Sequence, residues 1–334
     1  MNIVVFETET WAQTAWQRMK GCHEVRLLKE FLTSSNADEH ADAKVISTDL
    51  SRIDAGILEK FEDLQLIATR STGVDNIDLA YCADHRITVC NVPDYAEIAV
   101  AEHVFALLLS ISRHLCEAVE CTRTGTFSTD GLIGFDLHGK TLAIIGTGVI
   151  GRRVGKIARG FGMEVVAFDV KQDEQWAAAN GIRYKSFKEA LAVADIITLH
   201  VPATPDTHQL LATDQFAAMK EGAVIINTAR GELIDIQALL RALASGKIAA
   251  AGLDVLPEEQ AFLRGVKNPA TLFSGGKKLV TLLANHILLR HPNVFITPHC
   301  AFFTREAVQR ILDVTMANIE AFVGGEPQNV VVPL

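Results

Sequence analysis

Short apolar runs alternate with amphipathic stretches along almost the whole of this 334-residue chain. Several runs, such as Leu142–Ile145 and Val165–Phe168, are apolar at consecutive positions, which is typical of parallel strands covered on both faces. The predicted strands are Ile3–Phe6, Val45–Ile46, Leu66–Thr69, Thr88–Cys90, Leu142–Ile145, Val165–Phe168, Ile196–Leu199, Val224–Asn227, Ala250–Leu253 and Val294–Ile296. Because helical stretches separate them, the sequence predicts an α/β fold.

Two long helices are predicted to stand apart from this alternation. The first covers about Glu97–His114, and the second covers about Thr304–Val323, with Thr304 as a suitable N-cap and two glycines at its end. The alternation is interrupted at 257–291. We expect this segment to form a long surface loop with a helical piece at Lys278–Leu289.

A glycine-rich turn follows directly on one of the predicted strands. Gly146, Gly148 and Gly151 form a G-x-G-x-x-G motif between a strand and a helix, and Asp169 ends the next strand. The first glycine permits the tight turn, the second lets the backbone approach a pyrophosphate, and the third lets helix and strand pack closely. The pyrophosphate would sit at the helix N-terminus. Asp169 would accept hydrogen bonds from the ribose hydroxyls and repel a 2′-phosphate, which favours NAD over NADP, although Lys171 lies near.

This motif lies between the two long helices and sets the expected domains. A chain of this length exceeds one ordinary domain. We expect a dinucleotide-binding domain at residues 102–298. Residues 1–101 together with 299–334 would form the second, substrate-binding domain.

Composition and charge narrow the class of partners. Hydrophobic residues make up 49% of the chain and charged residues 21%, as in a globular protein with a sizeable core. The formal net charge of −9 argues against nucleic acid or an anionic membrane as a partner, because both attract clustered Lys and Arg. A small anionic substrate remains possible, since one local Arg can bind it.

Targeting and redox signals are few. The start, Met1–Phe6, resembles a strand and not a signal peptide. No apolar run reaches the length of about 18 residues that a membrane span needs.

The six cysteines are scattered without a C-x-x-C pair, which indicates reduced thiols and a cytoplasmic enzyme. His286, His291 and Cys300 fit no common zinc spacing, so we expect no metal.

Three polar groups follow the ends of later strands. Arg230 follows Val224–Asn227, Glu258 and Glu259 lie just beyond Asp254, and His299 follows Val294–Ile296. In open α/β sheets the carboxyl ends of the strands face the ligand crevice. One Arg, one carboxylate and one His are therefore expected to converge there.

A series of motifs in one order makes the resemblance to a known family specific. The motifs are Ser71–Asp78, Asn91–Tyr95, Val100–His103, Gly146–Gly151, His200–Pro202, Asn227–Gly231, Leu253–Glu259 and Thr297–Thr304. Over essentially the whole chain, the sequence resembles the D-2-hydroxyacid dehydrogenase family, and most closely its D-lactate dehydrogenase branch. The resemblance implies two Rossmann-like, doubly wound parallel-sheet domains, with the NAD-binding domain inserted into a flavodoxin-like substrate domain. It also implies a homodimer.

The resemblance assigns catalytic roles that the chemistry also needs. Arg230 would bind the substrate carboxylate bidentately. His299 would protonate the carbonyl oxygen as the hydride arrives and remove that proton in the reverse reaction. The family's acid falls five residues after the strand-end aspartate, which selects Glu259 over Glu258 as the partner of His299. The carboxylate would favour the imidazolium form.

The resemblance further implies the binding residues. The cofactor positions are Gly146, Gly148, Val149, Ile150, Gly151, Asp169, Val201, Pro202, Thr207, Thr228, Ala229, Arg230 and Asp254. The substrate positions are Thr72, Gly73, Tyr95, Arg230, His299 and Phe302, with the backbone amides of Thr72 and Gly73 gripping the carboxylate.

Two departures from the branch bear on substrate size. Ser47 aligns near a position where the branch tends to carry a tyrosine, and a serine there would leave more room. Phe303 stands where a tyrosine is common, while Phe302 keeps an aromatic wall. We therefore expect a pocket for pyruvate or a somewhat larger 2-keto acid. Alternatives on the same fold are phosphoglycerate or phosphite oxidation, and an NAD-sensing, corepressor-like binding protein. The acidic charge and the absence of basic segments speak against the last.

Overall fold

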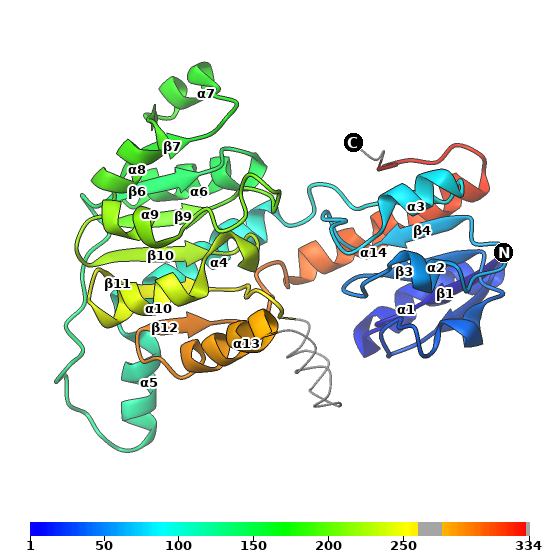
Figure 1. Ribbon diagram of the computed structural model, residues 1–334, viewed down its shortest axis with the longest axis horizontal. Helices are drawn as coiled ribbons and strands as arrows, with labels where there is room; N and C mark the ends of the chain where they lie inside the picture. The colour runs from blue at the N-terminus through cyan, green and yellow to red at the C-terminus, as the bar shows by residue number, and fades with distance from the viewer. Residues whose placement is uncertain (260–275, 332–334) are drawn as a thin grey trace. The chain divides into compact units, whose positions relative to one another are not determined.

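The computed structural model describes residues 1–259 and 276–331. The chain divides into two compact units, Met1–Tyr95 with Thr304–Leu334, and Ala96–Phe303. Each unit is built around one fully parallel sheet with helices on both faces (Figure 1). This confirms the predicted fold class of two doubly wound α/β domains.

The first unit holds a five-stranded sheet in the order β2-β1-β3-β4-β5. This is the flavodoxin-like strand order. The strands are β1 (Asn2–Val5), β2 (Glu24–Leu27), β3 (Val45–Thr48), β4 (Leu66–Thr69) and β5 (Thr88–Cys90). The helices are α1 (Gln13–Trp16), α2 (Ala55–Leu58), α3 (Leu79–Asp84) and α14 (Arg305–Val323), with short 3-10 turns η1 (Thr10–Ala12), η2 (Gln17–Gly21) and η3 (Ala37–His40).

The C-terminal helix α14 completes this unit. Thr304 caps it, because its hydroxyl accepts a hydrogen bond from the amide of Ala307. Leu312, Met316 and Ile319 form its buried face and pack with the apolar side chains of β1, β3 and β4. The predicted helix is therefore confirmed, and it covers one face of the sheet formed by the first residues of the chain.

The second unit holds a seven-stranded sheet in the order β12-β11-β10-β9-β6-β7-β8. Strand order reverses between β6 and β9, so this is the Rossmann arrangement with one further strand, and a ligand crevice is expected outside the carboxyl ends at that point. The strands are β6 (Thr141–Ile145), β7 (Glu164–Phe168), β8 (Arg183–Tyr184), β9 (Ile196–Leu199), β10 (Ala223–Asn227), β11 (Ile248–Leu253) and β12 (Val294–Ile296).

Helices cover both faces of this sheet. Helices α8, α9, α10 and α13 share one apolar cluster with the sheet, and α4, α6 and α7 share the other (Figure 1). Their bounds are α4 (Glu97–Ser112), α5 (Leu115–Arg123), α6 (Val149–Gly160), α7 (Glu174–Ala179), α8 (Phe187–Val193), α9 (Thr213–Ala218), α10 (Ile236–Ala244) and α13 (Gly276–Leu288), with the 3-10 turn η4 (Gly231–Leu233).

All ten predicted strands are present, and the described residues form two further strands that the sequence did not predict. Strand β2 reads Glu-Val-Arg-Leu and β8 is only Arg183–Tyr184. Both lie at sheet edges with half-exposed side chains. An edge strand needs no continuous apolar run, so the pattern that found the central strands could not find these.

The first long helix is shorter than predicted. Helix α4 ends at Ser112, and His114 adopts a left-handed backbone conformation with φ of 47°. A separate helix, α5, then begins at Leu115. The predicted piece Lys278–Leu289 is α13, while residues 260–275 of the predicted surface loop lie outside the described residues.

The unit boundaries differ by a few residues from the expected domains. Residues 97–101 belong to the second unit because they are the first turns of α4. His299 to Phe303 also belong to it. Hydrogen bonds from the amides of Cys300 and Ala301 to Asp254 tie this segment to the end of β11.

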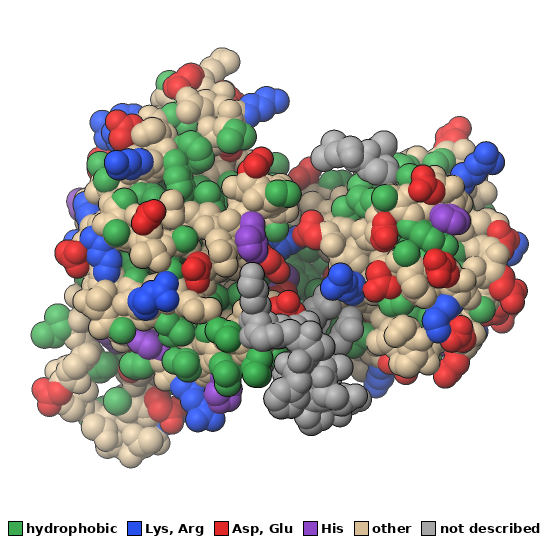
Figure 2. Space-filling view, in the orientation of Figure 1, with side chains coloured by type: hydrophobic (Ala, Val, Ile, Leu, Met, Phe, Trp, Pro, Cys, Tyr) green, Lys and Arg blue, Asp and Glu red, His purple; other side chains and the backbone are tan. Residues whose placement is uncertain are grey.

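Two surface properties complete the description. On the face shown in Figure 2, Lys and Arg side chains are interspersed with Asp, Glu and hydrophobic side chains. Among the described residues no single helix has the length and hydropathy to cross a membrane. The bent pair α4 and α5 meets those limits only when both are taken together.

Candidate active site

The glycine turn after β6 has the geometry that the motif predicts. Gly146 has φ of 100°, and a β-carbon there would lie 2.5 Å from the carbonyl oxygen of His200. A β-carbon on Gly151 would lie 2.0 Å from the carbonyl oxygen of Gly146. A β-carbon on Gly148 would meet nothing within 4 Å. Two glycines are thus required by the protein's own packing, and the third leaves the backbone open toward a ligand.

The N-terminus of α6 faces this opening. Gly148 is the N-cap residue, and no side chain caps the helix. Its first amides and its dipole therefore remain able to bind an anion. A groove of about 1080 Å³ runs past it, lined by Thr147, Gly148, Val149, Arg152, Arg153, Lys156, Asp169, Lys171, Gln172, Asp173, Glu174 and Trp176.

Arg152 is held rigidly along this groove. Its Nε donates to the carbonyl oxygen of Thr147 at 2.9 Å, and its Nη1 lies 2.9 Å from Oδ2 of Asp173. The guanidinium also stacks over Trp176, 4.9 Å from the ring centre. A fixed cation next to a free helix N-terminus suits a phosphate-bearing ligand.

Asp169 stands at the carboxyl end of β7 in the same groove. Its Oδ2 accepts from the amide and hydroxyl of Thr147, at 2.6 and 3.1 Å, and its Oδ1 accepts from the amide of Lys171 at 2.9 Å. Burial raises the pKa of Asp169, but these hydrogen bonds outweigh it and hold the pKa below its ordinary value. The group is therefore an oriented anion at neutral pH.

Other predicted cofactor positions surround the turn. Val201 packs against Gly146. The hydroxyl of Thr207 donates to the carbonyl oxygen of Pro202 at 2.6 Å and accepts from the amide of Thr204. These two hydrogen bonds hold together the loop from Pro202 to Thr207. Ile150 packs into the core below. Val149 is half exposed at the start of α6.

Thr228 carries an unsatisfied polar atom. Its Oγ1 is buried and has no hydrogen-bond partner in the described part of the chain. Buried hydroxyls are nearly always paired. A cofactor with polar groups beside the end of β10 would supply the missing partner, so Thr228 and the open Gly148 both fit the dinucleotide that the motif implies.

The turn after β10 presents Arg230. The Oδ1 of Asn227 accepts from the amide of Ala229 at 3.0 Å, and its Nδ2 donates to the carbonyl oxygen of Arg230 at 2.8 Å. Gly231 follows, and a β-carbon there would lie 2.1 Å from the carbonyl carbon of Leu256. This close approach brings the segment after β11 directly against the turn that carries Arg230.

His299 and Glu259 form a hydrogen-bonded pair. Nδ1 of His299 lies 2.6 Å from Oε1 of Glu259, and both side chains are mostly buried. The neighbouring Glu258 is exposed. The partner of His299 is thus the acid that the family spacing selected. Since Nδ1 is engaged, Nε2 is the nitrogen left for proton transfer.

The surroundings of His299 set its proton affinity. Burial lowers the pKa of His299, but the hydrogen bond and charge of Glu259 and the charge of Asp254 raise it. The charge of Arg230 lowers it again, and the net pKa lies above the ordinary value. The imidazolium form therefore persists to higher pH than in a free histidine, as proton donation requires.

A second polar cluster lies beside this pair and was not predicted. The carboxylate of Asp254 accepts from the hydroxyl of Thr297 at 2.5 Å and from the amides of Cys300 and Ala301, both at 2.9 Å. His103, on α4, places Nε2 3.0 Å from the Thr297 hydroxyl and 3.6 Å from Asp254. The contact joins residues far apart in sequence, so no local motif reveals it.

Three of these groups could in principle ligate a metal. The ligand atoms of His103, Asp254 and Cys300 lie within 4.8 Å of one another. However, the carboxylate is already bonded by three donors, and burial and the charge of Asp254 raise the pKa of the Cys300 thiol, which disfavours the thiolate that metals need. The hydrogen bonds account for this cluster without a metal.

Two predicted substrate residues of the first unit, Thr72 and Gly73, lie in a loop after β4 that hydrogen bonds hold in place. The Thr72 hydroxyl donates to the carbonyl oxygen of Val92, and Asn91 donates to the carbonyl oxygen of Thr72, both at 2.8 Å. The Ser71 hydroxyl donates to the carbonyl oxygen of Gly73 at 2.7 Å. Within the described residues the amides of Thr72 and Gly73 donate no hydrogen bond. Two adjacent amides in a rigid loop can bind a carboxylate.

The extra room expected beside Ser47 does not exist. Ser47 is 0% exposed. Its hydroxyl accepts from Nη1 of Arg70 at 3.1 Å, and the same guanidinium donates to the carbonyl oxygen of Phe6 and lies 3.6 Å from Glu7. The buried Arg70 and Glu7 pair fills the space that a smaller residue was predicted to open, so that prediction is wrong.

The other positions predicted to contact the substrate or set its size are aromatic. Phe302 is partly buried and meets the exposed Phe303 edge to face, with ring centres 5.9 Å apart. Tyr95 is partly buried, and its carbonyl oxygen accepts from Arg310 at 2.6 Å.

Comparison with known proteins shows the family. The profile described as "D-isomer specific 2-hydroxyacid dehydrogenase, NAD binding domain" matches residues 105–301. The chain is 36% identical over 329 residues to "2-hydroxyacid dehydrogenase homolog 1" of Schizosaccharomyces pombe, covering 96% of both chains. It is 39% identical over 271 residues to an aromatic 2-oxoacid reductase of Clostridium sporogenes, covering 79% of this chain and 78% of that one.

Solved structures of D-lactate dehydrogenases share the fold of this chain. The D-lactate dehydrogenase of Aquifex aeolicus, complexed with NAD and lactic acid, superposes with a TM-score of 0.88 at 32% identity and covers 100% of both chains. The apo D-lactate dehydrogenase of Escherichia coli superposes with a TM-score of 0.85 at 31% identity, covering 99% of this chain and 100% of the other.

Proposed function

Because the chain belongs to the family of D-isomer specific 2-hydroxyacid dehydrogenases, we propose that it interconverts a small 2-keto acid and the D-2-hydroxy acid with NADH. The observation that carries this proposal is the pair of His299 and Glu259, 2.6 Å apart, in the same unit as the open glycine turn. An imidazolium beside a nicotinamide cofactor is what the reduction of a ketone to an alcohol requires.

The residues have distinct tasks in this proposal. Arg230 binds the substrate carboxylate and fixes the orientation of the carbonyl group. His299 donates the proton on Nε2 to the carbonyl oxygen and takes it back in the reverse direction, while Glu259 holds Nδ1 and stabilises the charged ring. Bound NADH would supply the hydride. The amides of Thr72 and Gly73 would bind the same carboxylate.

We propose NAD as the physiological cofactor. Asp169 is an oriented anion at the end of β7. It can accept hydrogen bonds from both ribose hydroxyls and would repel a 2′-phosphate. Lys171 and Arg152 line the same groove, so weak use of NADPH is compatible with the geometry.

The substrate is proposed to be pyruvate or a somewhat larger 2-keto acid. D-Lactate dehydrogenases stand among the solved relatives, and an aromatic 2-oxoacid reductase stands among the sequence relatives. Since Ser47 is sealed off by Arg70, we assign substrate size to the aromatic positions Tyr95 and Phe302.

A panel of substrates tests the proposal. NADH and NADPH oxidation is measured with glyoxylate, pyruvate, 2-oxoisocaproate and phenylpyruvate, and the reverse reaction with D- and L-lactate, 3-phosphoglycerate and phosphite. We expect the highest kcat/KM for an unphosphorylated 2-keto acid with NADH. No turnover of any keto acid, with tight binding of NADH retained, would refute the enzymatic proposal and favour an NAD-sensing protein.

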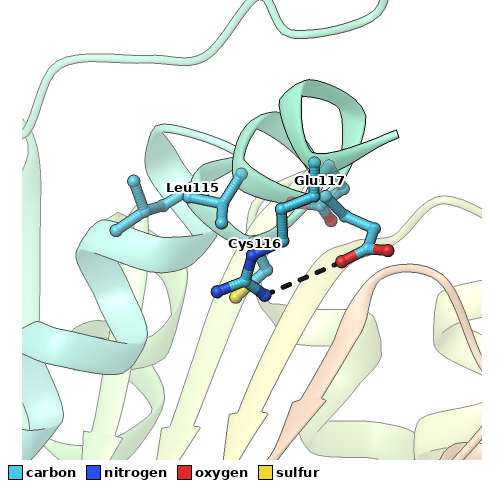
Figure 3. Close-up of a pocket in the computed structure, with 6 residues that line it drawn as sticks. Leu115, Cys116 and Glu117 are labelled. Carbon is cyan, nitrogen blue, oxygen red and sulfur yellow. Dashed lines mark ion pairs between the residues drawn. The ribbon is translucent and has the colours of Figure 1, made fainter. Parts of the chain in front are cut away.

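We also propose a homodimer formed through α5 and the segment that follows it. No side chain of α5 is fully buried, Leu115 and Val119 are exposed, and Phe127 and Ile133 are 86% and 90% exposed. Such apolar exposure is typical of an interface. A hollow of about 610 Å³ lies on this helix, beside Leu115, Cys116 and Glu117 (Figure 3).

Light scattering tests the homodimer. We expect a dimer mass for the native chain and a monomer mass for the double variant Phe127→Asp and Ile133→Asp, whereas an unchanged dimer would rule out this surface.

We also propose that the enzyme is cytoplasmic. Its six free cysteines fit a reducing compartment.

A further inference from the structure

The turn that carries His299 has an unfavourable backbone conformation. His299 has φ of 53°, a left-handed value that costs energy for a residue with a β-carbon. Its amide donates to the carbonyl oxygens of Asp254 and Thr297, both at 2.9 Å. A strained conformation persists only where the surroundings hold it in place. What holds this turn therefore determines where the proton donor points.

The carboxylate of Asp254 is the main restraint on the turn. Its two oxygens accept from the amides of Cys300 and Ala301, the two residues that follow His299. Asp254 is 1% exposed. Two amide hydrogen bonds to one buried carboxylate fix the turn only while the carboxylate keeps its rotamer.

The rotamer of Asp254 is fixed in turn by Thr297 and His103. The Thr297 hydroxyl has one hydrogen and gives it to Oδ1 of Asp254, because an ionised carboxylate can only accept. Nε2 of His103, 3.0 Å from the same hydroxyl, must then be the donor to it. The direction of the chain is thus His103 to Thr297 to Asp254, for the neutral Nε2–H tautomer and for the imidazolium alike.

Helix packing places His103 at this point. His103 and Leu107 lie one helical turn apart on the same face of α4. A β-carbon on Gly252 would lie 3.0 Å from Cβ of Leu107 and 2.9 Å from Cδ1 of Ile226. A glycine at this position of β11 lets α4 approach the strand closely, two residues before Asp254.

We propose that His103 is a positioning residue for proton transfer, acting through Thr297 and Asp254 to hold the turn that presents His299. The inference deepens the proposed function, and it rests on that function for its kinetic consequences. It extends the site from the strand ends to α4, since Nε2 of His103 lies 3.6 Å from Oδ1 of Asp254, the oxygen that also accepts from the amide of Cys300.

Kinetics of matched variants test the chain of hydrogen bonds. His103→Leu and Thr297→Val each remove one link at similar volume, while His103→Gln and Thr297→Ser keep a donor. We expect kcat to fall about tenfold in each of the first two, with KM for NADH within twofold. The conservative variants should recover most of the rate, and Glu102→Gln, an exposed neighbour on α4, should match the wild type.

The double variant separates a shared pathway from independent structural damage. If His103 acts through Thr297, the double variant His103→Leu with Thr297→Val loses about tenfold in kcat and not about a hundredfold. Multiplying losses would overturn the proposal. So would an unchanged kcat in His103→Leu.

The pH profile gives a second readout. The charged groups that act on His299 are Glu259, Asp254 and Arg230, and the titratable residues His103 and Cys300 both contact Asp254. When Asp254 turns away, its charge no longer helps to raise the pKa of His299, so the alkaline limb of kcat/KM should move to lower pH in His103→Leu. A limb that stays in place contradicts the proposal.

Hydrogen–deuterium exchange makes the test independent of turnover. The peptide covering residues 297–303 should exchange about tenfold faster in His103→Leu and in Thr297→Val than in the wild type, and at the wild-type rate in Glu102→Gln. Equal protection in all variants would overturn the inference. If the wild type reduces no keto acid, the proposed function fails, and this measurement still decides whether His103 holds the turn.

Discussion

Replacing Glu259 by glutamine isolates the effect of its charge on His299. Glutamine has nearly the same shape, and its amide oxygen can still accept from Nδ1. The native pair lies 2.6 Å apart, with 26% of each side chain exposed. The variant thus keeps the hydrogen bond and removes the negative charge that favours the imidazolium.

The size of the effect follows from the kinds of hydrogen bond involved. A hydrogen bond to a charged group contributes about 1.5–3 kcal/mol, and a neutral one about 0.5–1.5 kcal/mol. The difference of about 1–2 kcal/mol corresponds to a factor of roughly 5–30 in the protonation equilibrium. Burial and Arg230, which both lower the pKa of His299, are then opposed only by Asp254.

The assay is kcat/KM for keto-acid reduction between pH 5 and pH 9. The reduction needs protonated His299, so the rate is full below the pKa of His299 and falls as pH rises through it. Since Glu259 raises that pKa, Glu259→Gln should lose about 5- to 30-fold at pH 8 and little at pH 5. Glu258→Gln is the matched control and should follow the wild type. An equal loss at every pH would show that the charge of Glu259 does not act through the pKa of His299.

Three further predictions follow from single contacts. Asp169→Ala should raise KM for NADH about tenfold and narrow the preference for NADH over NADPH, measured by initial rates, because the ribose loses a charged acceptor. Gly231→Ala should lower the free energy of unfolding, measured by urea denaturation, by about 1–3 kcal/mol, because its β-carbon would lie 2.1 Å from the backbone of Leu256. Unchanged stability would mean that the turn after β10 and the segment after β11 do not touch. Burial raises the pKa of Cys82 and of Cys90 to about 11, so both should stay unlabelled by iodoacetamide at pH 8 in the native protein and react after unfolding, as read by mass spectrometry.

The parts of the fold that were predictable are those written in short stretches of sequence. The central strands are continuous apolar runs, and the glycine turn with Asp169 spans one strand–helix–strand unit. Helix α4 was predicted to end at about His114 and ends two residues earlier, at Ser112. The separate helix α5 that follows was not predicted, because none of its residues is fully buried and it has no apolar face packed into a core.

In the site, too, some residues could be predicted from short stretches of sequence and others could not. Arg230, Glu259 and His299 could be proposed because each follows a strand end, and parallel strands bring their carboxyl ends to one edge. The partners that shape them could not be proposed. His103 reaches Thr297 across most of the second unit's sequence. Arg70 fills the space beside Ser47 from a neighbouring strand end, which reversed the expectation from side-chain size alone.

We propose that His299 donates the proton in an NADH-dependent reduction that yields a D-2-hydroxy acid. The most direct test of this proposal is the rate and the stereochemistry of the product formed from the best keto acid by the wild type and by His299→Ala. We expect the D isomer alone from the wild type, and a rate at least about a hundredfold lower in the variant, with NADH affinity retained. An L product, or undiminished turnover by His299→Ala, would contradict it.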